Sequence, residues 1–289
     1  MICCLYEVEH GSFTSDASSR IRYSSHKSIF ETGAKRVGKK KFLSKHHPEA
    51  NIDGTSVHEG AVAFYSLVRA AMLQTDAKKV LNFGAGRGRF WYTNDKETGS
   101  LLRKSMQDLR APHLEVTACD IDPVVLTNPV SDHQVQIFPG KPLPFEDESF
   151  DIIVSDMTVE HIDEPKPVCD ELLRILRPGG FICVRTPNKW GYVALAAMLV
   201  PNDLHAKALT WIQGGRAEKD VFPTYYRMNT RGDFRTLFPS HQVYVTKHFS
   251  NPEYYFGSHL AYSAFRFLHW ILPRIFAPTL FAFVRKSPA

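Results

Sequence analysis

Three glycines at alternate positions follow a short apolar run in the segment VLNFGAGRGRF, residues 80–90. Glycine lacks a Cβ atom, so it permits a sharp turn and lets a ligand approach the main chain closely. A strand that ends in such a loop, with a helix N-terminus beyond it, is how doubly wound α/β folds bind nucleotides. The spacing is G-x-G-x-G, whereas dinucleotide-binding loops read G-x-G-x-x-G. The pattern therefore favours a nucleotide-type cofactor other than a nicotinamide or flavin dinucleotide, held at Gly84, Gly86 and Gly88.

An acidic side chain ends the next apolar segment. HLEVTACDIDP, residues 113–123, is typical of a buried strand with Asp120 at its carboxyl edge. A carboxylate at this position accepts hydrogen bonds from the ribose hydroxyls of a bound nucleotide. We therefore expect Asp120 to hold the ribose of the cofactor.

Three further segments come in a fixed order: LPFEDESFD at 143–151, TVEHI at 158–162 and ELLRILRPGG at 171–180. With the glycine loop and the acid, they resemble the S-adenosylmethionine (SAM)-dependent methyltransferases with a Rossmann-like fold. The resemblance is to the large group whose motifs read LPF-x-DxSFD, LEH and LRPGG, and it is close over about residues 78–188. It implies SAM as the cofactor and methyl transfer as the reaction.

The resemblance also assigns residues to the cofactor. Asp156 and Met157 are expected near its methionine end. Asn82 stands where the family usually carries an acid, and Pro139 replaces the acid that often meets the adenine amino group. Both departures lower the expected affinity for SAM. The full expected cofactor set is Asn82, Gly84, Gly86, Gly88, Asp120, Ile121, Asp156 and Met157.

Two groups are candidates for the acceptor side of the reaction. His161, with Glu160 beside it, is the best candidate for a general base, because the LEH-type motif lies just past the fourth strand. The alternative is that His161 serves local hydrogen bonding and Glu160 secures the loop. In VFPTYYRMNT, Tyr225, Tyr226 and Arg227 are candidates for the substrate pocket, with Arg227 suited to bind a phosphate or carboxylate bidentately. Aromatic core of a cap region is the alternative for this segment.

Alternating elements predict an α/β fold with a parallel sheet and right-handed crossovers. Ser56 and Glu59 form a capping-box pattern at the start of one expected helix. In the resembling family the last two strands form a hairpin, so we expect a Rossmann-like doubly wound sheet, mostly parallel, with an antiparallel last strand. Strands are expected near 79–83, 114–119, 134–138, 151–155, 180–185, 242–248 and 279–285, and helices at 56–74 and 167–177.

Three regions are expected along the chain. Residues 1–54 read as a basic, polar N-terminal extension or lid, and 55–190 as the SAM-binding core. Residues 191–289 read as a cap or substrate region that contains the last two strands and an apolar insertion at about 250–278. The run KRVGKKKFLSKHH at 35–47 holds six Lys or Arg and no acid. A solvated segment is the favoured interpretation of this run, and a phosphate or nucleic-acid contact is the alternative.

Composition excludes few classes of protein. With 44% apolar and 22% charged residues, the chain is ordinary for a globular protein, and its formal net charge of +5 permits an anionic partner without requiring one. Five cysteines without C-x-x-C spacing favour a reducing, cytoplasmic setting. The scattered histidines lack metal-ligand spacing, so no metal site is expected. After the fourth strand the chain reads SDMT rather than the N/D-P-P-aromatic tetrad of base-methylating enzymes, which disfavours nucleic acid as the acceptor.

The insertion at about 250–278 has several alternative roles. Its apolar residues cover nearly the whole helical circumference, which favours burial in a cap or a homodimer interface. Peripheral contact with a membrane or lipid substrate is the second interpretation, with Arg266 and Arg274 in support. The function expected overall is transfer of a methyl group to an oxygen or nitrogen of a small-molecule, glycan or lipid-linked acceptor. The alternative is a non-catalytic methyltransferase-like subunit that binds a partner.

Overall fold

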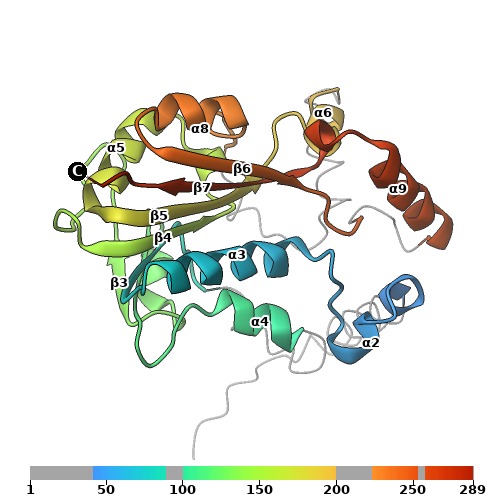
Figure 1. Cartoon of the computed structure of the whole chain (residues 1–289), viewed down its shortest axis with the longest axis horizontal. Coiled ribbons are helices and arrows are strands. Elements are labelled where there is room, and N and C mark those ends of the chain that lie inside the picture. The colour runs from blue at the N-terminus through green and yellow to red at the C-terminus, as the bar shows by residue number, and fades with distance from the viewer. Residues whose placement is uncertain (1–41, 89–99, 200–222, 253–257, 289) are drawn as a thin grey trace, which may run out of the picture.

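The computed structural model describes residues 42–88, 100–199, 223–252 and 258–288, with the side chains of 196–199 left out. Its centre is one seven-stranded sheet in the order β3-β2-β1-β4-β5-β7-β6 (Figure 1). All neighbouring strands run parallel except β7, which is antiparallel to both β5 and β6. The expected fold class is therefore confirmed. The strands are β1 (Lys79–Phe83), β2 (Glu115–Asp120), β3 (His133–Gln136), β4 (Phe150–Asp156), β5 (Leu176–Pro187), β6 (Gln242–His248) and β7 (Thr279–Arg285).

Helices cover both faces of this sheet (Figure 1). The α-helices are α2 (Ala50–Asp53), α3 (Gly60–Gln74), α4 (Leu101–Gln107), α5 (Pro165–Ile175), α6 (Tyr192–Leu199), α8 (Arg231–Leu237) and α9 (His259–Ile271), and residues 42–46 are also helical. The short 3₁₀ helices are η1 (Pro123–Thr127), η2 (Val159–His161) and η4 (Arg274–Phe276).

The core has one layer on each side of the sheet. On one side, Phe64 and Val68 of α3 pack against strand residues such as Ile152. On the other side, side chains of α5 and α8 pack against residues such as Ile153. Adjacent residues of β4 thus point into opposite layers, and its buried run is continuous, as expected for a parallel strand covered on both faces.

The chain order reverses between β1 and β4. It runs outward from β1 through β2 to β3 and then returns to β4 on the other side of β1. In open α/β sheets, ligands bind at the carboxyl ends of the strands that flank such a reversal. The fold therefore places the candidate site at the ends of β1, β2 and β4, where the sequence motifs lie.

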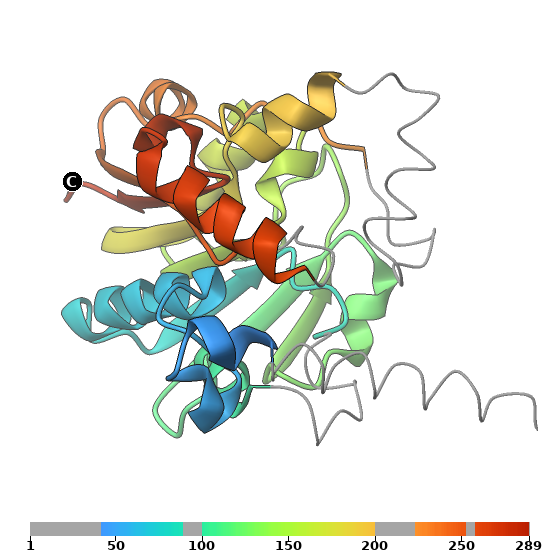
Figure 2. The same ribbon diagram turned by 90° about the vertical axis from the view of Figure 1, so that its right-hand side faces the viewer.

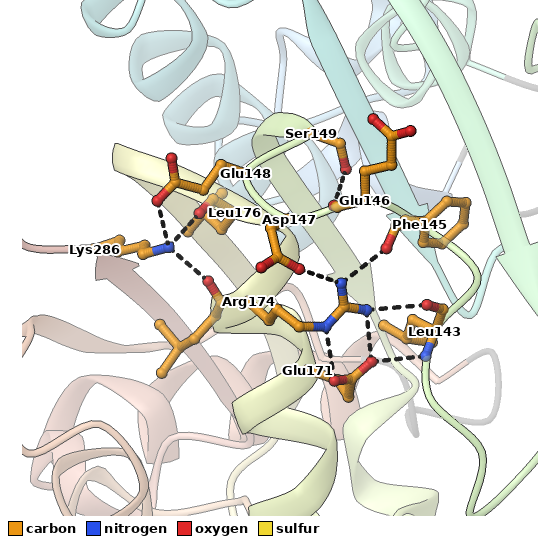
Figure 3. Close-up of polar contacts among 11 residues, drawn as sticks. Leu143, Phe145, Glu146, Asp147, Glu148, Ser149, Glu171, Arg174, Leu176 and Lys286 are labelled. Atoms are coloured by element: carbon orange, nitrogen blue, oxygen red, sulfur yellow. Dashed lines mark hydrogen bonds and ion pairs between the residues drawn. The ribbon is translucent and has the colours of Figure 1, made fainter.

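The segment with the LPF motif is fixed by one arginine of α5 (Figure 3). The Arg174 guanidinium donates to the carbonyl oxygens of Leu143 and Phe145 at 3.0 and 2.8 Å and pairs with the carboxylates of Glu171 and Asp147. Glu171 also accepts from the Leu143 N–H at 2.7 Å. The LPF segment and α5, which leads into the LRPGG motif, are thus joined to each other just before β4 and β5 begin, and this part of the pattern serves folding.

Two expected helix boundaries were wrong. The predicted capping box at Ser56 and Glu59 does not form: α3 begins at Gly60, and the Glu59 side chain makes no capping hydrogen bond. The Ser56 hydroxyl instead accepts from the Asn251 side-chain amide at 2.7 Å, a partner that is distant in the sequence. The expected helix at 167–177 begins two residues earlier, at Pro165, because proline is well suited to the first helical turn.

The apolar insertion is only partly buried. Of the residues in α9, only Tyr262 is buried, whereas Leu260, Phe267, Trp270 and Ile271 are exposed in the single chain. A cap formed by the same chain therefore accounts only for the inner face of this helix. The proposed lid function of the N-terminal extension falls mostly on residues 1–41, which lie outside the described residues.

Candidate functional site

The glycine loop after β1 adopts the conformation that requires glycine. Gly84, Gly86 and Gly88 have φ angles of 76°, 53° and 64°, all in the left-handed region. A Cβ atom at Gly84 would lie 2.2 Å from a Thr158 methyl carbon, and one at Gly88 would lie 2.5 Å from Asn128 Oδ1. A Cβ at Gly86 would meet only an Asp120 oxygen, at 4.0 Å. Gly84 and Gly88 are therefore packed against the protein, while Gly86 faces open space at the strand ends.

Asp120 joins the loop to the end of β2. Its Oδ2 accepts from the Gly86 N–H at 2.8 Å, and its Oδ1 accepts from the Asp122 N–H at 2.9 Å. The carboxylate is half-buried, so these two backbone donors hold it in one orientation at the carboxyl end of the sheet. This is the position that the sequence predicts for a ribose-binding acid.

Exposed apolar side chains follow β2 and β3. Ile121 is 45% exposed and directly follows Asp120, and Phe138 is 57% exposed and lies two residues past the end of β3. The two strands are paired at this end, where Asp120 is in register with Gln136. Sequence reasoning missed Phe138 as a site residue, because it formed the end of the strand expected at 134–138, whereas β3 ends at Gln136. Both side chains offer apolar surface suited to a planar base.

The two departures from the family pattern have clear positions. Asn82 is half-buried within β1, in register with Ala118 on one side and Val154 on the other. Pro139 lies in an exposed turn in which the Lys141 N–H donates to the Phe138 carbonyl at 3.2 Å. That backbone donor is thus already used in the turn.

Asp156, at the end of β4, is held by two other elements. Arg185 of β5 donates to its two carboxylate oxygens at 2.6 and 2.8 Å, and the Tyr65 hydroxyl of α3 donates at 3.2 Å. Burial, together with the nearby Asp156 charge, raises the pKa of Tyr65 well above its usual value, so the phenol remains a donor. Asp156 and Arg185 are 14% and 13% exposed. The carboxylate expected to contact the cofactor is therefore already paired within the protein.

Met157 is the residue at which the chain leaves β4. It has a φ of 54°, an uncommon value for a residue other than glycine, and its side chain is 38% exposed. Its N–H donates to the Arg185 carbonyl at 2.8 Å. Next to it, the Thr158 hydroxyl donates to the Gly84 carbonyl at 3.3 Å. The end of β4 thus touches the glycine loop directly, a link that sequence reasoning did not foresee.

Glu160 lies inside the protein rather than at the surface of the site. It is 5% exposed, and its Oε2 accepts from the Thr186 hydroxyl at 3.0 Å. The Asn229 side-chain amide donates to the same hydroxyl oxygen at 2.8 Å. Burial raises the pKa of the Glu160 carboxyl. These contacts join η2 to β5 and to the segment before α8, so the geometry favours the loop-securing alternative for Glu160.

His161 is oriented by a backbone carbonyl. Its Nδ1 lies 2.7 Å from the Pro223 oxygen, which can only accept, so Nδ1 carries the proton in this contact. In the neutral ring the basic atom is then Nε2. A histidine held in this way just past the end of β4 has the tautomer that a general base requires.

The segment that starts at Pro223 packs along η2. The N–H groups of Tyr225 and Tyr226 donate to the Glu160 carbonyl at 2.8 and 3.4 Å. Arg227 Nε lies 3.6 Å from an Asp163 carboxylate oxygen, in an exposed pair. The structure therefore brings the candidates at 225–227 to the same place as Glu160 and His161. Residues 200–222 lie outside the described residues.

No group of three or more His, Cys, Asp or Glu side chains in the described ranges is arranged to hold a metal ion. A pocket of about 250 Å³ lies at the opposite end of the sheet, next to Lys79, Glu115 and Phe150. These residues begin their strands, so the pocket is remote from the site described above.

Comparison with known proteins gives a consistent result. Residues 97–184 match a family described as "Methyltransferase domain". A stretch of 103 residues is 32% identical to an uncharacterized methyltransferase of Mycolicibacterium vanbaalenii and covers 35% of this chain and 37% of that protein. A stretch of 132 residues is 30% identical to the malonyl-[acyl-carrier protein] O-methyltransferase of Erwinia billingiae and covers 45% and 47% of the two chains. The matches thus span about a third to a half of these curated relatives.

Solved structures of methyltransferases also align with this chain. The plantazolicin methyltransferase BpumL, in complex with a triazolic desmethylPZN analog and SAH, aligns over 91% of this chain and 100% of its own, at 11% identity and a TM-score of 0.46. A SAM-dependent methyltransferase from Aquifex aeolicus aligns over 75% and 87%, at 12% identity and a TM-score of 0.41. The matched family segment runs from just before α4 to the end of the β5 core and includes Asp120, Asp156 and His161. The glycine loop precedes it, so evidence for the loop comes from its own geometry.

Proposed function

We propose that this chain is a SAM-dependent methyltransferase that acts on an oxygen or nitrogen of a small-molecule, glycan or lipid-linked acceptor. The observation that carries the proposal is the hydrogen bond between Asp120 and Gly86 at the reversal point of the sheet. It joins a left-handed glycine loop to the acid expected to bind a ribose. The family match over the neighbouring residues supports the same conclusion.

The chain's own residues would divide the work of binding and catalysis. The glycine loop, Asp120 and Ile121 would bind the nucleoside part of SAM, and Met157 would border its methionine end. SAM supplies a methyl group on a positively charged sulfur. The acceptor lone pair forms the new bond to that carbon while the sulfur–carbon bond breaks, and the sulfur keeps the electron pair. Holding the two reactants in line is worth about 7–11 kcal/mol of the barrier.

His161 is the proposed base for an acceptor that must lose a proton. Its Nδ1–H is held by the Pro223 carbonyl, which leaves Nε2 as the atom that takes the proton. Such a base contributes a factor of roughly 10²–10⁴ in rate. Tyr225 and Arg227 border the same place, so we propose them as the acceptor side of the site. The Asp163 partner of Arg227 would then have to yield to an anionic acceptor group.

Calorimetric titration of the purified chain with SAM and with S-adenosylhomocysteine tests the proposal. We expect both to bind, with Asp120→Ala weakening both. Asp170→Asn is the matched control, because Asp170 forms only an exposed pair with Lys166. Normal SAM affinity in Asp120→Ala would contradict the assigned site. A folded chain that binds neither ligand would instead favour the alternative, a non-catalytic subunit.

Turnover is tested with acceptors of different classes. Methyl transfer from labelled SAM would be measured with nucleotide sugars, lipid-linked saccharides and small hydroxylated or amino compounds, and with nucleic acid as the class expected to fail. Transfer to any of the first three by the chain alone would rule out the non-catalytic alternative. Transfer to nucleic acid alone would overturn the acceptor class.

A further inference from the structure

The outer face of α9 is apolar and exposed. Leu260, Phe267 and Ile271 are spaced by seven and four residues, so they lie along one side of the helix. They are 81%, 59% and 53% exposed, and Trp270, which lies next to the Phe267 ring at 5.8 Å, is 80% exposed. Ile275 of η4 adds further exposed apolar surface just beyond the helix. This set of five side chains is called the α9 face below.

The opposite side of α9 is firmly packed. The Tyr262 ring is fully buried, and its hydroxyl lies 2.8 Å from His47 Nε2. The Phe42 ring stacks on His259 at 4.1 Å, and the Tyr192 hydroxyl lies 2.8 Å from His269 Nε2. Contacts to residues 42–47 and to α6 thus fix the orientation of the helix. Because the inner side of α9 is held by these contacts, the exposure of the α9 face follows from a fixed orientation of the helix.

The charged side chains of α9 and η4 have one sign. From residue 254 to residue 289 the sequence contains no Asp or Glu and four Arg or Lys. Arg266 and Arg274 are exposed on α9 and η4. Lys45 lies in the helical segment packed against α9, and three lysines directly precede Phe42 in the sequence. An apolar stripe with Trp and Phe, surrounded by basic side chains, is the composition of a helix that lies in the surface of an anionic membrane.

We propose that the α9 face binds the surface of an anionic lipid bilayer. The helix would lie in the plane of the membrane, with Phe267 and Trp270 at the boundary between headgroups and acyl chains. No helix in the described ranges is long and apolar enough to cross a membrane. Pairing of two copies through this face is disfavoured, because it would bring Arg266 and Arg274 near their own copies with no acid in the segment to offset them.

The location of α9 connects this surface to the candidate site. The helix lies at the end of the molecule towards which β5 runs, beside α6 (Figures 1 and 2). β7, which follows α9 and η4, begins opposite Pro187, the last residue of β5. Membrane binding through the α9 face would therefore take place at the end of the molecule that carries the carboxyl ends of the strands. Binding of the α9 face to a bilayer does not depend on the proposed methyl transfer.

Vesicle co-flotation of the full chain tests the proposal. We expect the chain to float with vesicles that contain phosphatidylglycerol and to float weakly with phosphatidylcholine alone. Raising the salt concentration from about 0.1 M to about 0.5 M should reduce vesicle binding, because salt screens the attraction between the basic side chains and the anionic headgroups. The double variant Phe267→Ser/Trp270→Ser should bind at least about tenfold more weakly, since two large apolar anchors are lost.

Matched controls separate this surface from general effects. Leu73→Ser/Tyr244→Ser also removes two exposed side chains with large apolar parts, at positions on α3 and β6 that are 84% and 55% exposed, and should leave vesicle binding unchanged. Circular dichroism spectra and urea denaturation midpoints should be the same in all variants, which shows that they fold whether or not the chain binds SAM. Wild-type chain that fails to float with anionic vesicles, or equal binding by the α9 double variant, would overturn the proposal. A dimer that the α9 substitutions dissociate, without vesicle binding, would assign the face to self-association instead.

Discussion

The carboxylate of Asp120 accepts a hydrogen bond from the backbone N–H of Gly86, over 2.8 Å. This bond connects two sequence motifs that lie on neighbouring parallel strands, β1 and β2. Because Gly86 has open space around its Cα and Asp120 is fixed by a second backbone donor, the pair forms a rigid polar corner at the strand ends. An acceptor of this kind suits the hydroxyl groups of a ribose ring, which is the role proposed for Asp120.

Asp120→Ala should weaken SAM binding by about 10- to 100-fold, as expected for the loss of a hydrogen bond to a charged group. The substitution also leaves the Gly86 N–H without its partner, so the loop should loosen. Calorimetry with SAM measures the affinity. Asp120→Asn retains one acceptor oxygen, so its SAM affinity should lie between those of the wild type and Asp120→Ala. Equal affinities of the wild type and the alanine variant would show that the corner does not bind the cofactor.

Gly84→Ala should destabilise the protein more than Gly140→Ala. Both glycines have positive φ, 76° and 72°, so each substitution incurs the left-handed penalty of about 1–2 kcal/mol. Only at Gly84 would the new Cβ overlap the Thr158 side chain, whereas nothing lies within 4 Å at Gly140. Urea denaturation of both variants measures the difference in unfolding free energy. Equal destabilisation would mean that the loop moves away from Thr158 without cost.

Arg185→Gln should lower the unfolding free energy by about 3–5 kcal/mol, because it leaves the Asp156 carboxylate buried without its charged partner. Tyr65→Phe removes one hydrogen bond to the same carboxylate and should cost only about 1 kcal/mol. The double variant Asp156→Asn/Arg185→Gln should recover part of the loss, since no charge then remains buried. Chemical denaturation of the single and double variants completes the cycle. Additive effects would contradict a direct pairing.

His161→Gln should reduce kcat by about 10²–10⁴-fold without changing SAM affinity, if Nε2 takes the acceptor proton. His133→Gln is the control, because His133 begins β3 at the opposite end of the sheet and pairs with Glu115 at 3.1 Å. Steady-state kinetics with an identified acceptor, together with calorimetry for SAM, separates the two effects. Unchanged kcat in His161→Gln would leave the histidine with a purely local hydrogen-bonding role.

The sheet was predictable from the sequence because its signals are local. The strands at Gln242–His248 and Thr279–Arg285 lie at their expected bounds, since each has a clear apolar pattern between turn residues. The glycine loop and Asp120 were predictable for the same reason, as each ends a short apolar run. In this fold the carboxyl ends of neighbouring parallel strands meet at one edge of the sheet, so residues that end predicted strands are expected to lie near one another.

The remaining features depend on contacts between distant residues. Nothing near Ser56 in the sequence indicates that its hydroxyl bonds with Asn251 and does not cap α3. Likewise, Asp156 lies 29 positions before Arg185 and 91 after Tyr65, so the pairing of its carboxylate is visible only in three dimensions. For α9, composition alone predicted general burial, whereas docking through Tyr262 buries one side and leaves the other exposed.

Acidification should loosen the attachment of α9. Burial lowers the pKa of His269 to about 4, compared with about 6.5 for an unfolded histidine, and it lowers the pKa of His46 and His47 as well. A histidine that is neutral when folded stabilises the fold above the unfolded pKa, and this contribution is lost as the pH falls from about 6.5 towards about 4. Protonation would also leave His269 Nε2, which lies 2.8 Å from the Tyr192 hydroxyl, able only to donate a hydrogen bond.

Hydrogen exchange across residues 259–271 measures this loosening directly. Between about pH 7.5 and about pH 5, corrected for the intrinsic pH dependence of exchange, protection of α9 should fall while that of β4 and β5 persists. His269→Gln keeps a hydrogen-bond acceptor but does not titrate, so its α9 protection should depend less on pH than that of the wild type. The same pH dependence in both proteins would show that His269 is not the responsible group. Protonation of His46 and His47 would then have to account for the loss of protection in α9.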